Sequence, residues 1–142
     1  MPQITEENAR QMIAVVNTRN VEKVMDQYAE NATFQVPILE TPLKGKEAIR
    51  AFITGNYAAF PDWTIDVKKV FVSGDETVVV GSVHGTHTGP MTGLDGKIIA
   101  PTNKRFVQDQ ATRVVFNDHG KVTSLRAFGN SADLAHQLGL SK

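Results

Sequence analysis

The sequence predicts an α+β fold in which three N-terminal helices pack on a strongly curved, mostly antiparallel sheet and enclose a pocket. Apolar residues recur at helical spacing in the first third of the chain, whereas from Trp63 onward they alternate with period two. A long twisted sheet curls, and helices laid across its concave side close it into a cone. The 142 residues suit one domain that spans positions 1–142.

Three helices are expected before the long strands. Thr5 offers an N-cap oxygen, and apolar residues at positions 9, 12, 13 and 16 follow at the spacing of one helix face. After Asn20, a second cap, the same spacing recurs over 21–28. A short strand over 32–36 stops at Pro37, which cannot donate a ladder hydrogen bond. A third helix opens at Gly45 and ends near Gly55.

The rest of the chain is typical of an antiparallel meander that ends in a helix. Turn residues at 73–76 and 117–120 separate segments of alternating character, and a loop is expected over 89–96. A final helix over 131–138 is stopped by Gly139. The expected strands begin at Trp63 and then cover 77–88, 104–116 and 121–128.

Composition excludes several classes of protein. Fifteen basic residues balance fifteen acidic ones, so we expect neither nucleic acid nor a membrane surface as a partner. The chain has no cysteine for a disulfide framework, and its apolar runs are too short to span a bilayer. Residues 1–7 are acidic where an export signal would be basic. These features favour a cytoplasmic protein.

Several motifs resemble those of a known family in order and spacing. They are Phe-Pro-Asp at 60–62, Gly-Thr-His-Thr-Gly at 85–89, Pro-Thr-Asn-Lys at 101–104 and Gln-Leu-Gly at 137–139. The chain resembles the SnoaL-like polyketide cyclases of the nuclear-transport-factor-2-like (NTF2-like) superfamily. The resemblance implies a cone-shaped fold, a homodimer, and an apolar cavity for a small hydrophobic or polycyclic ligand. It also implies intramolecular aldol cyclisation by acid–base chemistry, without metal or cofactor.

A second relative, ketosteroid isomerase, is suggested by segments 29–33 and 116–127. The resemblance would place that family's carboxylate base at Val36, and its two oxyanion-stabilising groups at Met12 and Thr112. None of these side chains abstracts a proton from carbon, so the shared feature is the fold alone.

Three residues are candidates for catalysis. His84 and His87 are three apart on one expected strand and therefore point to opposite faces, so one should face the cavity. The superfamily comparison turns His84 inward, whereas the cyclase motif favours His87; either also fits a hydrogen bond within the sheet or at its rim. Asn130 stands where the cyclases carry a carboxylate, and an amide is no general base. Asn130 equally suits the N-cap of the last helix.

A second set of residues is expected to bind the substrate. Gln108, Gln110 and Thr112 share one face of the 104–116 strand, and buried amides need a partner such as a ligand or water. The same face would alternatively meet a second subunit or solvent. Asp109, on the other face, suits an ion pair and is only a fallback base. Apolar candidates for the cavity lining are Phe34, Val36, Phe52, Trp63 and Leu125.

Two functions fit these observations. The first is a cofactor-independent cyclase or isomerase for an apolar, oxygenated ring compound, in which His84 or His87 moves a proton and Asn130 or Gln110 orients a carbonyl. The second is a non-catalytic binding protein for small hydrophobic ligands, favoured by Asn130 in place of the carboxylate. Fold alone does not decide between them, because function resides in the site.

Overall fold

The computed structural model describes residues 4–92 and 96–140. The helices found there are α1 (Glu6–Val16), α2 (Val21–Met25), α3 (Lys46–Ala59) and α4 (Ser131–Gln137). The strands are β1 (Tyr28–Gln35), β2 (Leu43–Lys44), β3 (Thr64–Ser73), β4 (Glu76–Thr86), β5 (Met91–Thr92), β6 (Ile98–Ile99), β7 (Arg105–Phe116) and β8 (Val122–Phe128).

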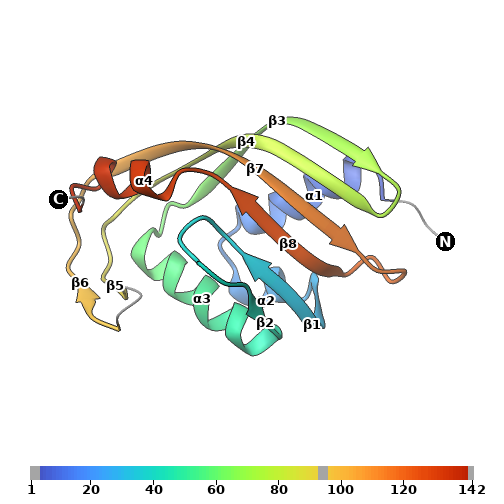
Figure 1. Ribbon diagram of the computed structural model, residues 1–142, viewed down its shortest axis with the longest axis horizontal. Coiled ribbons are helices and arrows are strands. Elements are labelled where there is room, and N and C mark those ends of the chain that lie inside the picture. Colours follow the sequence, from blue (N-terminus) through green and yellow to red (C-terminus); the bar gives the residue numbers. More distant parts are fainter. Residues whose placement is uncertain (1–3, 93–95, 141–142) are drawn as a thin grey trace.

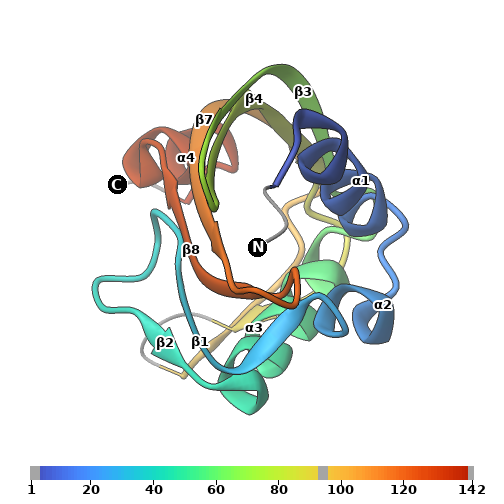
Figure 2. The same cartoon turned by 90° about the vertical axis from the view of Figure 1, so that its right-hand side faces the viewer.

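Six strands form one mixed sheet in the order β2-β1-β8-β7-β4-β3, and β5 pairs with β6 in a separate hairpin. β1 runs parallel to β8, and the other neighbours in the large sheet are antiparallel. The sheet curls strongly, and α1, α2 and α3 lie across its open side (Figures 1 and 2). This arrangement confirms the predicted α+β class.

Gly81 of β4 permits the sheet to bend sharply against β3. A Cβ atom at this position would lie 2.2 Å from the Asp66 carbonyl oxygen, closer than any side chain tolerates. The register between β3 and β4 also shifts between Val67 and Lys69, immediately beside Gly81. A bulge and a glycine together are a common device for bending a sheet, and here they bring β3 toward α1.

The predicted helix starts are correct. The Thr5 hydroxyl accepts a hydrogen bond from the Asn8 N–H at 3.1 Å, and the Asn8 side chain accepts one from the Thr5 N–H at 3.0 Å. Asn20 caps α2 by accepting from the Lys23 N–H at 3.1 Å. Each cap satisfies a backbone donor that has no partner inside its helix.

Two predicted helix ends are wrong. The second helix ends at Met25 rather than near Tyr28, because Tyr28 opens β1 and pairs with Val122 of β8. An apolar residue at this spacing fits either a helix face or the start of a strand. Tyr28 starts a strand because β8 is available as its parallel partner. The third helix continues past Gly55 to Ala59. Its last turn is held because the Tyr57 hydroxyl donates to the Val16 carbonyl at 2.8 Å.

The strand predictions also need correction at their ends. β4 stops at Thr86, so His87 lies just beyond the strand. β1 begins four residues before the expected start, and the short strands β2, β5 and β6 were not predicted. The expected loop over 89–96 contains β5, and residues 93–95 lie outside the described part.

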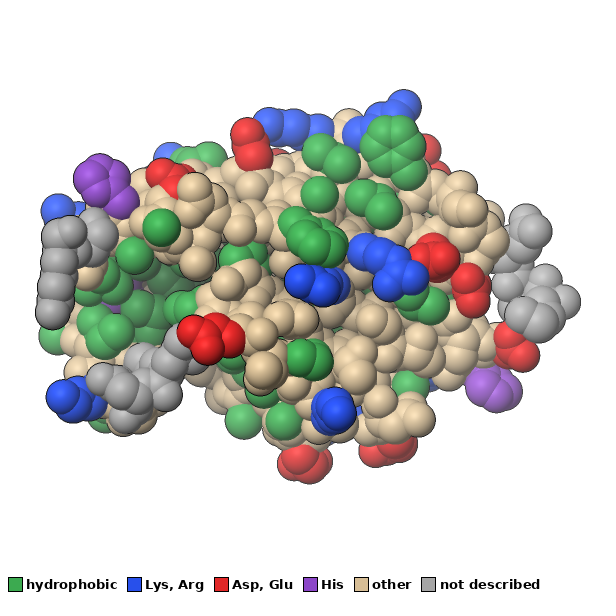
Figure 3. All heavy atoms as spheres, in the orientation of Figure 1, with side chains coloured by type: hydrophobic (Ala, Val, Ile, Leu, Met, Phe, Trp, Pro, Cys, Tyr) green, Lys and Arg blue, Asp and Glu red, His purple; other side chains and the backbone are tan. Residues whose placement is uncertain are grey.

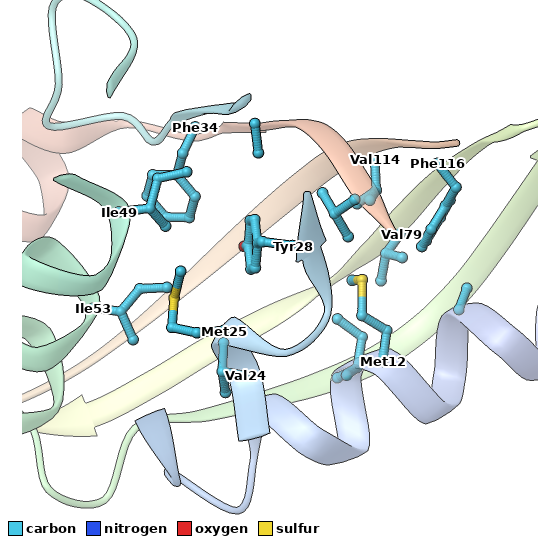
Figure 4. Close-up of a cluster of buried hydrophobic side chains, with 14 of the residues drawn as sticks. Met12, Val24, Met25, Tyr28, Phe34, Ile49, Ile53, Val79, Val114 and Phe116 are labelled. Carbon is cyan, nitrogen blue, oxygen red and sulfur yellow. The ribbon is translucent and has the colours of Figure 1, made fainter. Parts of the chain in front are cut away.

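Two clusters of buried hydrophobic side chains lie between the helices and the sheet. In the larger cluster, helix side chains such as Met12 and Ile53 point toward strand side chains such as Val79 and Tyr28 (Figure 4). The smaller cluster lies at the α4 end and consists of Ala59, Phe60, Val83, Phe106 and Leu138. Trp63, Met91, Leu134 and Leu140 pack against it.

Candidate functional site

Alternation along β4 and β7 decides which side chains face the helices. Odd-numbered positions of β4 are buried, and His87 continues this series beyond the strand. On β7 the even-numbered positions face inward, with Gln108 buried and Gln110 and Thr112 half-buried. The sequence therefore predicted the inward face of β7 correctly.

His87 is fully buried, with no exposed surface. Its ring lies 5.5 Å from that of Phe60, centroid to centroid. The Nδ1 atom lies 3.1 Å from the Thr102 hydroxyl and accepts a hydrogen bond from the Thr102 N–H at 3.3 Å. Nε2 is buried without a hydrogen-bond partner among the described residues. Burial lowers the pKa of His87, and the nearby Gly89 backbone, which favours the protonated ring as a hydrogen-bond acceptor, opposes this to a smaller extent.

His84 lies on the outer face of the sheet. The inward orientation expected from the superfamily comparison is wrong, because β4 turns its odd-numbered residues inward. The His84 Nε2 atom lies 3.1 Å from the Asp66 carboxylate on the neighbouring strand. His84 and His87 therefore do not meet in one site, and His84 is separated from the interior by the sheet.

Gln108 and Gln110 form a short chain of hydrogen bonds on the inner face. The Gln110 amide donates to the Gln108 Oε1 atom at 2.8 Å, and the Gln108 amide donates to the Asn130 backbone oxygen. Gly129 makes room for this pair, since a Cβ there would lie 3.1 Å from the Gln108 Oε1 atom. Each glutamine thus has a protein partner before any ligand arrives.

Asn130 is the N-cap of α4. Its side-chain oxygen accepts a hydrogen bond from the Asp133 N–H at 3.0 Å, and the residue is exposed. The sequence analysis offered N-capping of the last helix as one role for Asn130, and the structure confirms that role. With Val107, Gln108, Asp109 and Asp133, Asn130 lines a cleft of about 390 Å³.

The predicted apolar lining is divided between the two hydrophobic clusters. Phe34 and Phe52 contact each other in the larger cluster, with ring centroids 5.5 Å apart. Val36 and Leu125 pack against the same cluster. Trp63 belongs to the smaller one, where its ring lies 5.8 Å from Phe60 and 5.6 Å from Phe106. Aromatic rings and His87 therefore occur together only in the smaller cluster.

The motif residues around His87 hold the loops in place. The Asp62 carboxylate accepts from the Thr86 N–H at 2.7 Å and from its hydroxyl at 2.8 Å. Partial desolvation by itself would raise the pKa of Asp62. The two hydrogen bonds from Thr86 outweigh it and hold this pKa below its ordinary value.

The Gln137 side chain fastens α4 to β7. Its amide accepts from the Val107 N–H and donates to the Val107 carbonyl, both at 2.8 Å, as a strand neighbour would. Sequence reasoning did not select Asp62, Thr102 or Gln137 as site residues. The motifs at 60–62, 101–104 and 137–139 contain these three residues. Their individual roles follow only from the contacts that the loops make with one another in the folded protein.

A hollow lined by hydrophobic side chains is visible between α4 and the β5–β6 hairpin (Figure 3). This is the end of the molecule where the smaller cluster and His87 lie. A second cavity, of about 510 Å³, lies at the opposite end between α1 and the β7–β8 turn. Both places combine apolar side chains with a buried polar atom that has no partner among the described residues, Nε2 of His87 at the smaller cluster and Oε1 of Gln27 at the second cavity. The smaller cluster with His87 is the stronger candidate, because an imidazole can donate or accept a proton near neutral pH and an amide oxygen cannot.

The described residues limit the chemistry of this site. The polar side chains buried among them are Thr77, His87 and Gln108, so this interior contains no carboxylate. Asp109 faces outward and pairs with Lys68 at 3.2 Å. No group of three or more His, Asp or Glu among the described residues is arranged to hold a metal ion. None of the described helices is long and apolar enough to cross a membrane.

Solved structures with the same fold include three that cover nearly the whole chain. A protein assigned as a SnoaL-like polyketide cyclase from Jannaschia sp. CCS1 matches with a TM-score of 0.80 at 18% identity, over 100% of this chain and 98% of that one. A protein with a ketosteroid isomerase-like fold from Catenulispora acidiphila, in complex with trimethylamine, matches with a TM-score of 0.77 at 17% identity, over 96% and 95%.

The third structure is SalBIII, an epoxide hydrolase/cyclase-like enzyme that has a role in pyran ring formation in the polyether salinomycin. It matches with a TM-score of 0.75 at 21% identity, over 90% of this chain and 92% of that one. At these identities the three structures establish the fold. No protein with a curated description matches the chain by sequence.

The sequence model of the SnoaL-like polyketide cyclases matches residues 6–138, from the first residue of α1 to the residue after α4. This match includes the motifs at 60–62, 85–89 and 101–104, and the first two residues of the motif at 137–139. The chain therefore belongs to the SnoaL-like polyketide cyclase family.

Proposed function

We propose that this protein binds an apolar, oxygenated ring compound beside the smaller hydrophobic cluster and promotes its ring closure or isomerisation without a cofactor. The observation that carries the proposal is His87, a buried imidazole next to the Phe60 ring. Its Nε2 atom has no hydrogen-bond partner among the described residues. A ligand oxygen that contacts Nε2 would satisfy this polar atom. The ligand's rings would pack on Phe60, Trp63 and Phe106.

Burial increases the effect that His87 has on a ligand. Leaving a buried polar atom unpaired costs free energy, and a ligand that pairs with it recovers that cost. A hydrogen bond in a dry, apolar site also stabilises developing charge more strongly than the same bond in water. Family membership and the ring-forming role of SalBIII support ring chemistry as the reaction class.

Substitution of the two histidines tests this proposal. Purified protein would be assayed by mass spectrometry for carried-through ligand and for turnover of polyketide-type ring precursors. His87→Gln should reduce turnover by at least tenfold, whereas His84→Gln on the outer face should leave it within twofold. Equal effects of the two substitutions, or none from His87→Gln in an active preparation, would contradict the proposal.

A second candidate is a non-catalytic binding protein for the same class of ligand. It is favoured by Asn130, which caps α4 where the family resemblance expects a carboxylate. Asn130→Asp is a suitable test, because aspartate is an equally good N-cap and should not unfold the helix. Turnover that appears only in the Asn130→Asp variant would favour the binding protein. Turnover in the unaltered protein would favour the enzyme.

The homodimer implied by the family resemblance is also a proposal. The outer face of the sheet exposes Phe71, Val107 and Phe128, by 55%, 45% and 50% respectively. Burying these side chains against a second copy would remove apolar surface from water. Light scattering of the purified protein measures the mass directly, and Phe128→Lys should shift it to that of a monomer.

A further inference from the structure

The environment of the His87 Nδ1 atom fixes where the ring carries its proton. The Thr102 N–H points at Nδ1 from 3.3 Å, and a backbone N–H can only donate. Nδ1 must therefore act as an acceptor. In a neutral imidazole one nitrogen accepts and the other carries the hydrogen, so the proton of His87 resides on Nε2.

The Thr102 hydroxyl strengthens the same assignment. It lies 3.1 Å from Nδ1 and itself accepts a hydrogen bond from the Lys104 N–H at 3.4 Å. With that bond occupying an acceptor position, the hydroxyl hydrogen is free to point at Nδ1. One residue thus offers two donors to Nδ1. Protonation of Nδ1 would place its hydrogen against the Thr102 N–H.

The ring cannot easily turn over to exchange its two nitrogens. It is fully buried, and it packs 5.5 Å from the Phe60 ring. The backbone on both sides is held as well, because the His87 N–H donates to the Lys104 carbonyl and the His87 carbonyl accepts from the Asn103 N–H. Asn103 has a positive φ of 59°, which turns the Thr102–Lys104 segment back toward His87. Nδ1 therefore stays with Thr102 and Nε2 stays on the other side.

We propose that Thr102 is a positioning residue that holds His87 as a neutral Nε2–H donor, so that His87 contributes a hydrogen bond to a ligand oxygen and does not abstract a proton. This inference rests on the proposed function for its ligand. A nitrogen that already carries hydrogen has no lone pair to accept a substrate proton. A neutral imidazole does polarise a carbonyl oxygen and stabilise the negative charge that develops there. No proton leaves the ring in this role.

The tautomer is measured directly by NMR, without a ligand. Protein labelled with ¹⁵N in its four histidines gives long-range ¹H–¹⁵N correlations, and the His87→Gln variant identifies the His87 signals by their loss. We expect Nδ1 to resonate as an unprotonated nitrogen and Nε2 as a protonated one at pH 7. A protonated Nδ1 in the unaltered protein would overturn the proposal.

Two variants of Thr102 separate positioning from general stability. Thr102→Val removes the hydroxyl and keeps the backbone donor, so the Nδ1–H form should rise about fivefold, the effect of one ordinary hydrogen bond. Thr102→Ser keeps both donors and should retain the original tautomer. Thr88→Val, at an exposed threonine that directly follows His87 in the chain, is the matched control and should change neither. If Thr102→Val does not fold, the unaltered protein and Thr102→Ser still decide the tautomer.

Kinetics then connect the tautomer to function. In an active preparation Thr102→Val should lower kcat with little change in KM, and Thr102→Ser should restore it. An Nε2–H tautomer in a protein whose turnover survives His87→Gln would contradict the proposed function and leave the tautomer assignment standing. A protonated Nδ1 together with a large loss of turnover in His87→Gln would overturn the tautomer assignment and leave the proposed function standing.

Discussion

The two hydrophobic clusters occupy the same layer between helices and sheet, yet they differ in kind. The larger cluster collects fifteen buried residues from three helices and five strands. The smaller cluster has five, and one of them, Phe60, packs against the buried imidazole of His87. Each cluster adjoins a buried polar atom that has no hydrogen-bond partner among the described residues: Oγ1 of Thr77, which pairs with Val114 of the larger cluster, and Nε2 of His87 at the smaller one. Only the His87 atom belongs to an imidazole.

This difference separates stability from function. A cluster that joins many elements contributes to folding through the area it removes from water. A small cluster with an unpartnered polar atom contributes less and retains the capacity to bind. We therefore expect substitutions in the larger cluster to change stability most, and substitutions in the smaller one to change ligand binding most.

The largest effect is expected from Ile49→Ala in the larger cluster. Ile49 is fully buried, and truncation of such a side chain costs about 2–5 kcal/mol of unfolding free energy. Leu138→Ala in the smaller cluster is the matched change, and it should cost about half as much because α4 packs chiefly on β7 alone and can relax into the space. Urea denaturation measures both. Equal losses would remove the distinction between the clusters.

A smaller loss is expected from Gly81→Ala, which tests the bend that closes the larger cluster. The added Cβ would meet the Asp66 carbonyl oxygen at 2.2 Å, and relieving such a clash costs about 1–3 kcal/mol. Gly55→Ala is the control, since nothing lies within 4 Å of its Cβ position on α3. That change should raise stability by about 0.5–1 kcal/mol. A tolerated Gly81→Ala would mean that the sheet bends for another reason.

Alkaline pH should weaken the larger cluster through Tyr57. Burial raises the pKa of Tyr57 to about 12 from its ordinary 10. The folded protein therefore keeps a proton that the unfolded chain loses, and stability falls as pH rises from 10 toward 12. Tyr57→Phe should reduce this dependence without abolishing it, because burial also raises the pKa of Tyr28 in the same cluster. Thermal unfolding at a series of pH values gives the measurement, and an unchanged slope in the variant would assign the loss to another group.

Acid pH should weaken the smaller cluster through His87, and this is the smallest effect. Its pKa in the folded protein lies below the ordinary 6.5, so the unfolded chain binds a proton that the folded protein excludes. Stability therefore rises with pH through the window just below 6.5 and is lost on acidification. His87→Gln should remove that dependence, whereas His84→Gln should retain it. The same unfolding series, extended to pH 5, makes this comparison.

Local features of the structure were predictable from sequence. Thr5, Asn20 and Asn130 are caps because each places a side-chain oxygen beside free backbone donors of a helix. The turn before β8 was predictable from Gly120, whose φ of 73° suits glycine. Alternation correctly placed Gln108, Gln110 and Thr112 on one face. These signals depend only on residues close in sequence.

Features that depend on distant residues were not predictable. Tyr28 opens a strand because β8, almost a hundred residues later, supplies a parallel partner. His84 faces outward because the helices cover the other face of β4, which alternation alone does not reveal. Thr102 reaches His87 only because the segment after β6 folds back beside the end of β4. None of these contacts has a local pattern.

The sequence by itself determined the helix caps, the main turns, the period of the long strands and the membership of the chain in its family. Only the tertiary structure decided that His87 rather than His84 is enclosed, and that Thr102 contacts its Nδ1 atom while Nε2 has no partner among the described residues. The physical reason is that a period-two pattern assigns neighbours to opposite faces but does not say which face becomes the interior. That choice is made when helices from another part of the chain remove one face from water.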